Sequence, residues 1–212
     1  MRTSLAASRR NGTTQTRKAS VKATQSEESL PGLRIGEVVL RTGRYDEMKQ
    51  WYCQVLAMDP YLEHIPVGMP EPDTNVAAQL WATQLRLCFF RLALDHPYQQ
   101  VVAIFDVPGT QPLASSGPGL HHIQLRDQSP RIMARRHVKL RALGIVPFKA
   151  MDHGPTTSFY YRDPDQNMVE IAAPNHAGVA DFLLASHTPQ YMSNPSGQPI
   201  SPDTLAGSFD SL

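Results

Sequence analysis

The chain has 212 residues, of which 41% are hydrophobic, and its formal net charge is +1 at pH 7. This length allows one domain of about 150 residues with tails, and such a domain folds without disulfide crosslinks. Cys53 and Cys88 lie in apolar segments, so we expect reduced core thiols in an intracellular protein. No apolar run approaches the roughly 20 residues of a membrane-spanning helix, which predicts a soluble protein without a membrane partner.

The charges are unevenly distributed. Residues 1–25 hold six basic side chains and no acid, which leaves 14 basic against 19 acidic side chains in the remainder. A slightly acidic body argues against nucleic-acid binding, which needs a basic face. The Ser, Thr and Arg content of the start predicts a disordered basic arm over residues 1–30. Organelle transit peptides share this composition, so mitochondrial import stays open beside a cytoplasmic location.

The first half of the expected domain begins near Pro31. Residues 33–42 form a β-branched run that predicts a strand. A helix should follow Gly43 and end near Met58 and Asp59, since Pro60 cannot continue it. Its apolar side chains recur at helical spacing: Met48, Trp51, Tyr52, Val55 and Leu56. Further strands are predicted at residues 61–65, 75–81, 85–94 and 101–105.

The second half repeats this order after a linker rich in Gly, Pro and Ser at residues 107–119. A strand is predicted at residues 120–127. Ser129 and Pro130 are suited to the N-cap and first position of a helix that runs to about Leu143, with Gly144 as its stop. Strands should follow at residues 148–152, 158–162 and 168–172. Beyond about residue 185 the composition predicts a disordered or loosely docked tail.

The two halves align at an offset of 85 residues, which pairs Leu40 with Leu125, Arg41 with Arg126, Met48 with Met133 and Ala57 with Ala142. A period this long indicates two copies of one strand–helix–three-strand module rather than a solenoid. We therefore expect an α+β fold in which two βαβββ modules, residues 33–106 and 120–175, enclose one cavity between curved sheets.

Three side chains could ligate a metal in that cavity. Glu37 and His122 take the same place in the first strand of each half. Alternation puts Glu170 alone on the face opposite Val169 and Ile171, where a carboxylate needs a partner or a metal. Alternatively, this face of the sheet is exposed to water and Glu170 is hydrogen-bonded to a neighbour without binding a metal. His122 shares its face with Gln124 and Arg126, whereas His121 should be a packed, hydrogen-bonded histidine.

The segments LHHIQLRD, Asp152-His153-Gly154 and SFYYRDPDQNMVEI resemble the second half of a vicinal-oxygen-chelate protein, the superfamily of glyoxalases, bleomycin resistance proteins and extradiol dioxygenases. The resemblance covers roughly residues 33–175 and places the domain within residues 31–178, followed by a tail at 179–212. Among members, the chain is most similar to the single-domain type I extradiol catechol dioxygenases. That resemblance implies a metal-dependent enzyme acting on a small aromatic or vicinal-oxygen substrate, such as a catechol.

Residue by residue, the resemblance implies that His122 and Glu170 are metal ligands. It implies that Tyr160 hydrogen-bonds a bound catecholate and that His153 is the acid–base catalyst. Glu37 departs from the pattern, because extradiol enzymes place a histidine there. Fe(II) is the first expectation, and the added carboxylate admits Mn²⁺, Mg²⁺, Zn²⁺ or Ni²⁺. The fourth position of the superfamily falls near Cys88, where no carboxylate stands.

Two alternatives to a dioxygenase remain open. The first is a non-redox isomerase, lyase or cyclase of the same fold, with Glu37 as a base rather than a ligand. The second is a non-catalytic protein that binds an aromatic ligand. Because both modules lie in one chain, a monomer suffices for one site, and a homodimer is equally compatible.

Overall fold

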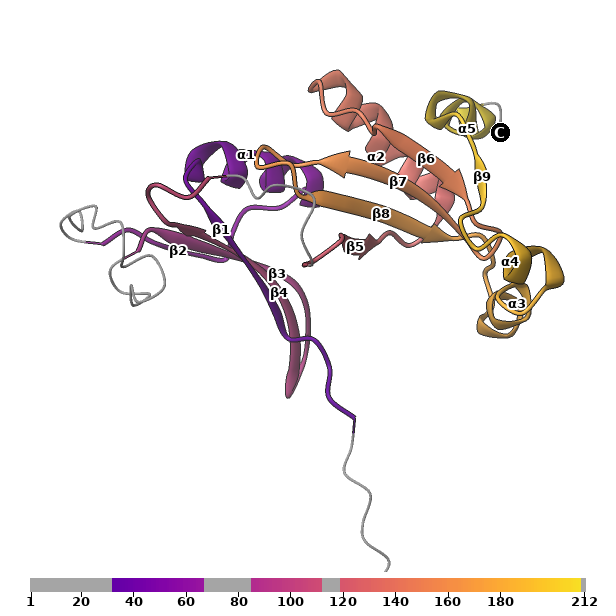
Figure 1. The fold of residues 1–212 in the computed structure, drawn as a ribbon, viewed down its shortest axis with the longest axis horizontal. Coiled ribbons are helices and arrows are strands. Elements are labelled where there is room, and N and C mark those ends of the chain that lie inside the picture. The colour runs from indigo at the N-terminus through magenta and orange to yellow at the C-terminus, as the bar shows by residue number, and fades with distance from the viewer. Residues whose placement is uncertain (1–31, 67–84, 112–118, 211–212) are drawn as a thin grey trace, which may run out of the picture. The chain divides into compact units, whose positions relative to one another are not determined.

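The computed structural model describes residues 32–66, 85–111 and 119–210, and residues 34–212 form one compact unit. The order strand–helix–three strands occurs twice along the chain, as predicted (Figure 1). The first module comprises β1 (Glu37–Thr42), α1 (Tyr45–Leu56), β2 (Leu62–His64), β3 (Leu87–Asp95) and β4 (Tyr98–Asp106). The second comprises β5 (Ile123–Arg126), α2 (Pro130–Ala142), β6 (Lys149–Asp152), β7 (Thr156–Arg162) and β8 (Met168–Pro174).

Each module builds its own sheet with the same topology. The strand orders are β1-β4-β3-β2 and β5-β8-β7-β6-β9. In both sheets the first strand pairs in parallel with the last strand of the module, with Glu37 opposite Val101 and Ile123 opposite Val169. The remaining pairs are antiparallel. This arrangement confirms the α+β class and the two βαβββ modules, while the cavity between them stays a prediction.

The two module helices follow the local signals of the sequence. Ser129 caps α2 by accepting a hydrogen bond on Oγ from the Ile132 backbone N–H, and Pro130 is the first helical residue. Gly144 follows with a φ of 78°, which glycine adopts without strain. Helix α1 ends earlier than predicted, because Ala57 takes a left-handed conformation with a φ of 56°. The helix therefore ends before it reaches Pro60, which was expected to terminate it.

The apolar faces of both modules meet in one cluster of buried side chains. Its members are Leu40, Tyr45, Met48, Trp51, Tyr52, Val55, Cys88, Phe90, Val102, Ile104, Met133, Leu140, Ala150, Phe159, Tyr161, Val169, Ile171 and Ala173. Burial of each large apolar side chain contributes about 1.5–3 kcal/mol. Arg136 adds a polar link between the modules, since Nη1 donates to the Val55 carbonyl at 2.9 Å. The shared core leaves the opposite sheet faces for the site.

Several strand bounds differ from the sequence-based expectation. Strand β1 starts only at Glu37, because Leu33 and Ile35 are exposed and unpaired with the sheet. Strand β5 starts at Ile123 and leaves both adjacent histidines ahead of it. Strand β4 is longer than predicted and begins at Tyr98. The strand predicted at residues 75–81 lies outside the described residues.

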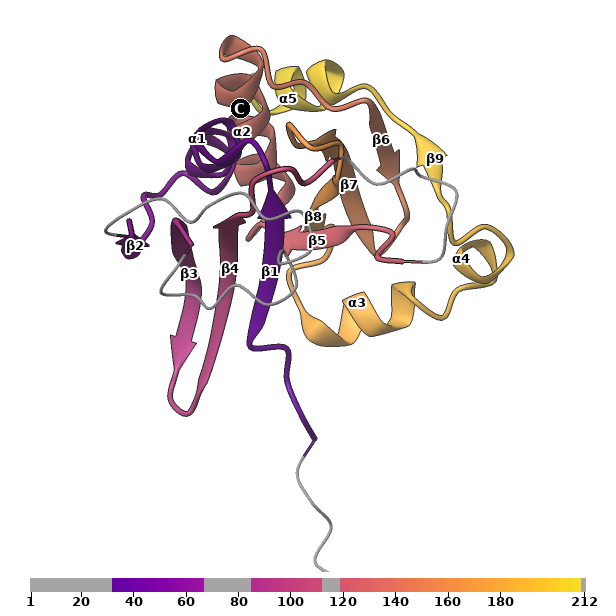
Figure 2. The ribbon, with the colours of Figure 1, turned by 60° about the vertical axis from the view of Figure 1, so that its left-hand side comes forward.

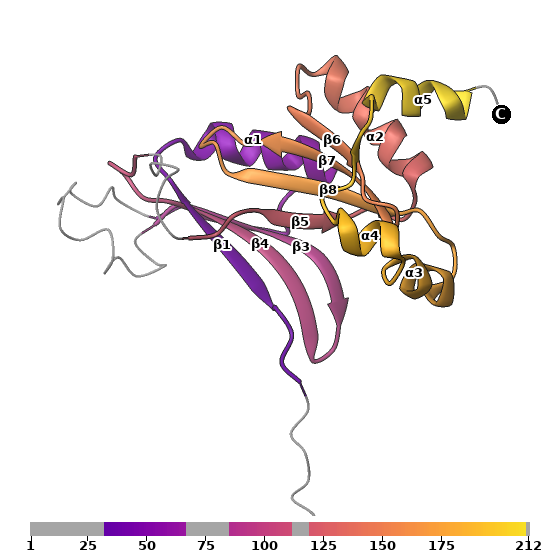
Figure 3. The ribbon, with the colours of Figure 1, turned by 45° about the vertical axis from the view of Figure 1, so that its right-hand side comes forward.

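The C-terminal segment is part of the fold, contrary to the expected loose tail. It contains α3 (Val179–Ala185), α4 (Pro189–Ser193), β9 (Gln198–Pro199) and α5 (Pro202–Asp210). Strand β9 extends the second sheet by pairing with β6 (Figure 2). Helix α5 packs along α2 (Figure 3), where buried His137 donates to Asp203 at 3.0 Å. Ile200, Leu205 and Ala206 pack against the rest of the fold, a tertiary contact that composition does not reveal.

Both cysteines are free, and Cys88 is fully buried in the core, as expected for core thiols. Within the described ranges, no helix combines the length and the apolar character that crossing a membrane requires.

Candidate functional site

A row of side chains crosses three strands of the second sheet. Tyr160 on β7 stands opposite Glu170 on β8, and Glu170 stands opposite Gln124 on β5. The neighbours Val169 and Ile171 point the other way into the core. Alternation therefore isolates Glu170 on the polar face, as the sequence predicted.

Glu170 is the centre of this row. Its side chain is 4% exposed, so its carboxylate depends on fixed partners rather than water. Oε1 accepts a hydrogen bond from Nε2 of Gln124 at 3.0 Å, and Oε2 lies 2.9 Å from Nε2 of His122. The structure thus brings together the two residues for which the sequence signal was clearest. Gln124 was expected on this face, but its role in holding the carboxylate was not.

His121 and His122 lie directly before β5. Their Nδ1 atoms are 2.7 Å apart, so one imidazole donates a hydrogen bond to the other. His121 is exposed rather than packed, which corrects the sequence-based expectation. The reason is that the strand begins only after both histidines, so strand alternation does not turn His121 into the core. Its hydrogen bond is made with its neighbour.

Tyr160 and His153 form the second half of the site. The Tyr160 hydroxyl lies 3.1 Å from Nε2 of His153, and Nδ1 of His153 lies 3.0 Å from the carbonyl oxygen of Pro195. A carbonyl only accepts, so Nδ1 carries the proton. In neutral His153, Nε2 then accepts from the Tyr160 hydroxyl. Burial, followed by the nearby charge of Glu170, raises the pKa of Tyr160 to about 12, so the phenol stays protonated at neutral pH.

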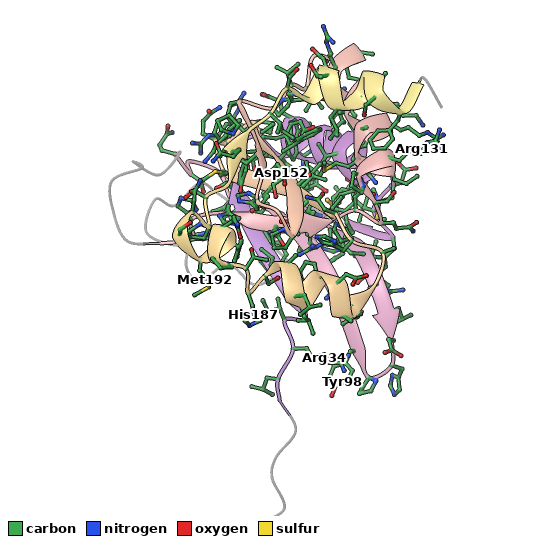
Figure 4. All side chains as sticks on the ribbon, turned by 90° about the vertical axis from the view of Figure 1, so that its right-hand side faces the viewer. Arg34, Tyr98, Arg131, Asp152, His187 and Met192 are labelled. Atoms are coloured by element: carbon green, nitrogen blue, oxygen red, sulfur yellow. The ribbon has the colours of Figure 1, made fainter. Side chains whose placement is uncertain are left out.

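The segment that carries Pro195 is held tightly against the end of β6. Gly197 has a φ of 74°, and an added Cβ would stand 2.2 Å from the carbonyl oxygen of Asp152. Asn194 closes the turn by donating from Nδ2 to the Gly197 carbonyl. In Figure 4, Asp152 marks the end of β6, and His187 and Met192 mark the helical segment that precedes this turn. Nothing in the sequence indicates which strand this turn contacts.

Glu37 is not joined to this group. It is the first residue of β1 in the other sheet, it is exposed, and its side chain makes no hydrogen bond or ion pair within the described part of the chain. Among the described residues, no three His, Cys, Asp or Glu side chains gather closely enough to hold a metal ion. The structure therefore unites His122, Glu170, Tyr160 and His153, and leaves Glu37 outside.

The donor atoms of His122 and Glu170 have the chemistry and the spacing of a metal-ligand pair. Imidazole nitrogen and carboxylate oxygen bind divalent metals at about 2.0–2.2 Å. Two such ligands at right angles on one ion lie about 3 Å apart. The observed Nε2–Oε2 distance of 2.9 Å is compatible with that arrangement. These residues therefore fit two positions of a metal site.

Known proteins share this chain's pattern over most of its length. Residues 34–171 match the model of the glyoxalase/bleomycin resistance protein/dioxygenase superfamily. The chain is 28% identical to biphenyl-2,3-diol 1,2-dioxygenase 2 of Rhodococcus globerulus over 80% of its own length and 77% of that protein. It is 30% identical to biphenyl-2,3-diol 1,2-dioxygenase 3 of the same organism, over 83% of the chain and 82% of that protein.

A crystal structure of a glyoxalase/dioxygenase from Nostoc punctiforme is 16% identical, with a TM-score of 0.48 over 74% of this chain and all of that one. The superfamily match spans both βαβββ modules, from just before β1 into β8. The chain therefore belongs to the glyoxalase/bleomycin resistance protein/dioxygenase superfamily.

Proposed function

We propose that the chain is a metal-dependent dioxygenase that opens the ring of a small aromatic compound with neighbouring hydroxyl groups. The observation that carries the proposal is the His122–Glu170 pair, whose donor atoms are spaced as ligands of one ion. The names of the two Rhodococcus relatives, which describe biphenyl-2,3-diol dioxygenases, support the choice of reaction. Fe(II) is the proposed metal, and Mn²⁺, Mg²⁺, Zn²⁺ and Ni²⁺ are the alternatives.

A bound divalent ion would lower the pKa of substrate hydroxyls and, as Fe(II), would allow electrons to pass from the substrate to O₂. To bind it, Nε2 of His122 must be unprotonated, so Nδ1 of the neutral ring carries the proton. His121 then offers the acceptor, because its Nδ1 lies 2.7 Å away. Gln124 similarly holds Glu170 by Oε1, so that Oε2, which faces Nε2 of His122, is the oxygen that would bind the ion.

Tyr160 and His153 would handle the substrate's protons. Tyr160 stands beside Glu170 on the sheet, and its hydroxyl contacts His153. From this position the hydroxyl can donate to a substrate oxygen. His153 presents an unprotonated Nε2 and can accept a proton directly or through Tyr160. Its other nitrogen is anchored on Pro195, which fixes the ring in this orientation.

The test combines metal content with oxygen uptake. Protein purified without chelator and reconstituted anaerobically with Fe(II) should consume oxygen when given catechol or biphenyl-2,3-diol. The variants His122→Ala and Glu170→Gln should lose both bound iron and turnover. His187→Ala is the matched control, because this exposed histidine contacts a backbone carbonyl outside the site. Full activity in an iron-free preparation, or unchanged turnover in both site variants, would contradict the proposal.

A non-redox isomerase, lyase or cyclase is the second candidate, and one observation favours it. The Glu37 side chain is exposed and makes no hydrogen bond or ion pair within the described residues, so its carboxylate is free to accept a proton. In that case Glu37→Gln keeps its metal and loses turnover of a substrate with an enolisable oxygen pair. Loss of metal from the same variant would instead identify Glu37 as a ligand. Retention of both metal and activity would assign it neither role.

A further inference from the structure

Three basic side chains surround the row of Tyr160, Glu170 and Gln124. Arg126 follows Gln124 by two residues on β5, and its Nη2 donates to Oε1 of Gln124 at 3.0 Å. Lys149 stands opposite Tyr160 on β6, and its Nζ lies 5.2 Å from the centre of the Tyr160 ring. Each of these two cations is thus in contact with a member of the row.

Arg162 is the third cation. It lies two residues after Tyr160 on β7 and therefore on the same face of the strand. Its guanidinium carbon lies 4.8 Å from the ring centre of Phe148, and the Phe148 ring lies 6.5 Å from that of Tyr160. Its Nη1 donates to the carbonyl of Gln166. The Phe148 ring and the Gln166 carbonyl are both uncharged, so the positive charge of Arg162 is not neutralised by either contact.

The charges of these three cations are not neutralised by a carboxylate within the described residues. Within the described residues, Arg126, Lys149 and Arg162 form no ion pair. Some other arginines do pair with acids, as Arg86 does with Asp46 and Asp106, and Arg136 with Asp127. The carboxylate of the row, Glu170, is already engaged by Gln124 and His122. Among the described residues, positive side chains therefore outnumber negative ones around the candidate metal pair.

An aromatic surface lies among these charges. Phe148 is 51% exposed although it packs beside the Tyr160 ring and under the Arg162 guanidinium. A flat ring could cover its exposed side, and burying apolar area there would be favourable. Guanidinium and ammonium groups at the edge of such a ring favour a carboxylate through charge-assisted hydrogen bonds.

From this arrangement we infer that the substrate is an aromatic acid, a ring with neighbouring hydroxyls that also carries a carboxylate. The inference rests on the proposed function and narrows it. The hydroxyls face His122 and Glu170, while the carboxylate is held by some or all of Arg126, Lys149 and Arg162. The biphenyl-2,3-diol in the names of the relatives carries no such carboxylate. The three basic residues would thus determine specificity and would take no part in ring opening.

The test compares two ligands that differ by the carboxylate, 3,4-dihydroxyphenylacetate and 4-methylcatechol. Their dissociation constants are measured by calorimetry with the full chain under argon, so that binding is observed without turnover. The acid should bind tighter by roughly tenfold or more, and the ratio should fall as salt is raised. Lys149→Gln and Arg162→Gln should each reduce the ratio several-fold. Lys139→Gln, which removes an exposed cation from α2, should leave it unchanged.

The outcomes separate this inference from the proposed function. Equal affinities, a ratio that the Lys149 and Arg162 variants leave unchanged, or no binding of either ligand would overturn the aromatic acid as substrate. Oxygen uptake is then measured with both ligands after loading with Fe(II). Oxygen uptake with both ligands and no preference for the acid would support the dioxygenase proposal and contradict the aromatic acid as substrate. Tighter binding of the acid without any oxygen uptake would support an aromatic acid as the ligand and contradict the dioxygenase proposal.

Discussion

Nδ1 of His153 lies 3.0 Å from the carbonyl oxygen of Pro195, a residue 42 positions further along the chain. This hydrogen bond connects the C-terminal segment to the proposed acid–base pair. It holds the imidazole with Nε2 toward the Tyr160 hydroxyl. The segment after the second module therefore takes part in building the site, although it contributes no side chain to the row on the sheet.

The Gly197→Ala substitution should weaken this support. The new Cβ would meet the Asp152 carbonyl at 2.2 Å, and the left-handed φ of 74° adds strain of about 1–3 kcal/mol. The turn must shift, and Pro195 moves with it. We expect turnover to fall roughly tenfold or more while metal content stays near one equivalent, because a small displacement of a catalytic group costs rate.

Gly109→Ala is the control for that experiment. Gly109 has a φ of 79°, close to that of Gly197, but no atom lies within 4 Å of its added Cβ. The backbone strain is thus matched without the clash. If both variants lower activity equally, the effect belongs to strain, and the positioning role of the segment is wrong.

The Tyr160→Phe substitution should separate metal binding from proton handling. It removes the hydroxyl 3.1 Å from His153 but leaves His122 and Glu170 in place. We expect retained metal and a kcat lower by about a hundredfold, the usual range for loss of a positioned proton donor or acceptor. Tyr161→Phe is the comparison, because Tyr161 belongs to the core cluster on the other face of β7. Loss of metal from Tyr160→Phe would place this residue among the determinants of the metal site instead.

The Glu37→His substitution tests the position at which the chain departs from extradiol enzymes. If Glu37 supplies the third protein ligand, histidine there should create a site of two imidazoles and one carboxylate. We expect the variant to retain Fe(II) through dialysis at least as well as the wild type and to keep oxygen uptake. Elemental analysis and oxygen-electrode rates check this. Metal affinity that is unchanged in both Glu37→His and Glu37→Gln would show that this side chain does not reach the ion.

Acidification should release helix α5. The hydrogen bond from His137, followed by the charge of Arg141, lowers the pKa of Asp203 below its ordinary value of 3.8. A carboxyl group whose pKa is lower in the folded protein stabilises it above the unfolded pKa. That contribution is lost as the pH falls from about 3.8 through the lower folded pKa. The protection of the amides of residues 202–210 against hydrogen exchange, taken relative to the intrinsic rate at each pH, should therefore fall over this window.

The Asp203→Asn variant supplies the comparison for the pH experiment. It should exchange faster in α5 than the wild type at neutral pH, and the two proteins should converge below the folded pKa of Asp203. Unfolding by urea at several pH values would report the same convergence in the free energy of unfolding. A difference that stays constant down to the acid limit would show that the Asp203 charge does not hold the helix.

Much of the fold follows from local sequence signals. Ser129, Pro130 and Gly144 delimit α2 because capping and backbone conformation depend on neighbouring residues. The isolation of Glu170 between Val169 and Ile171 follows from strand alternation, which also holds over a few residues. The recurrence of one strand–helix–three-strand pattern was visible for the same reason.

The site needed contacts between distant segments. The partnership of Gln124 with Glu170 depends on the parallel register of β5 and β8, and that of His153 with Pro195 on the docking of a turn far along the chain. The exposure of His121 was missed because strand β5 begins two residues after it. Alternation cannot predict where a strand starts.

The residues alone predict the two modules and the polar face of the second sheet, and they make His122, Glu170, Tyr160 and His153 the candidates for the site. Tertiary structure alone decided that these four lie together, that Glu37 stands apart from them, and that the C-terminal segment supports His153. The physical reason is the distance along the chain over which each interaction acts. Periodicity and capping act over a few residues, whereas sheet register and segment docking are set by the packing of the whole core.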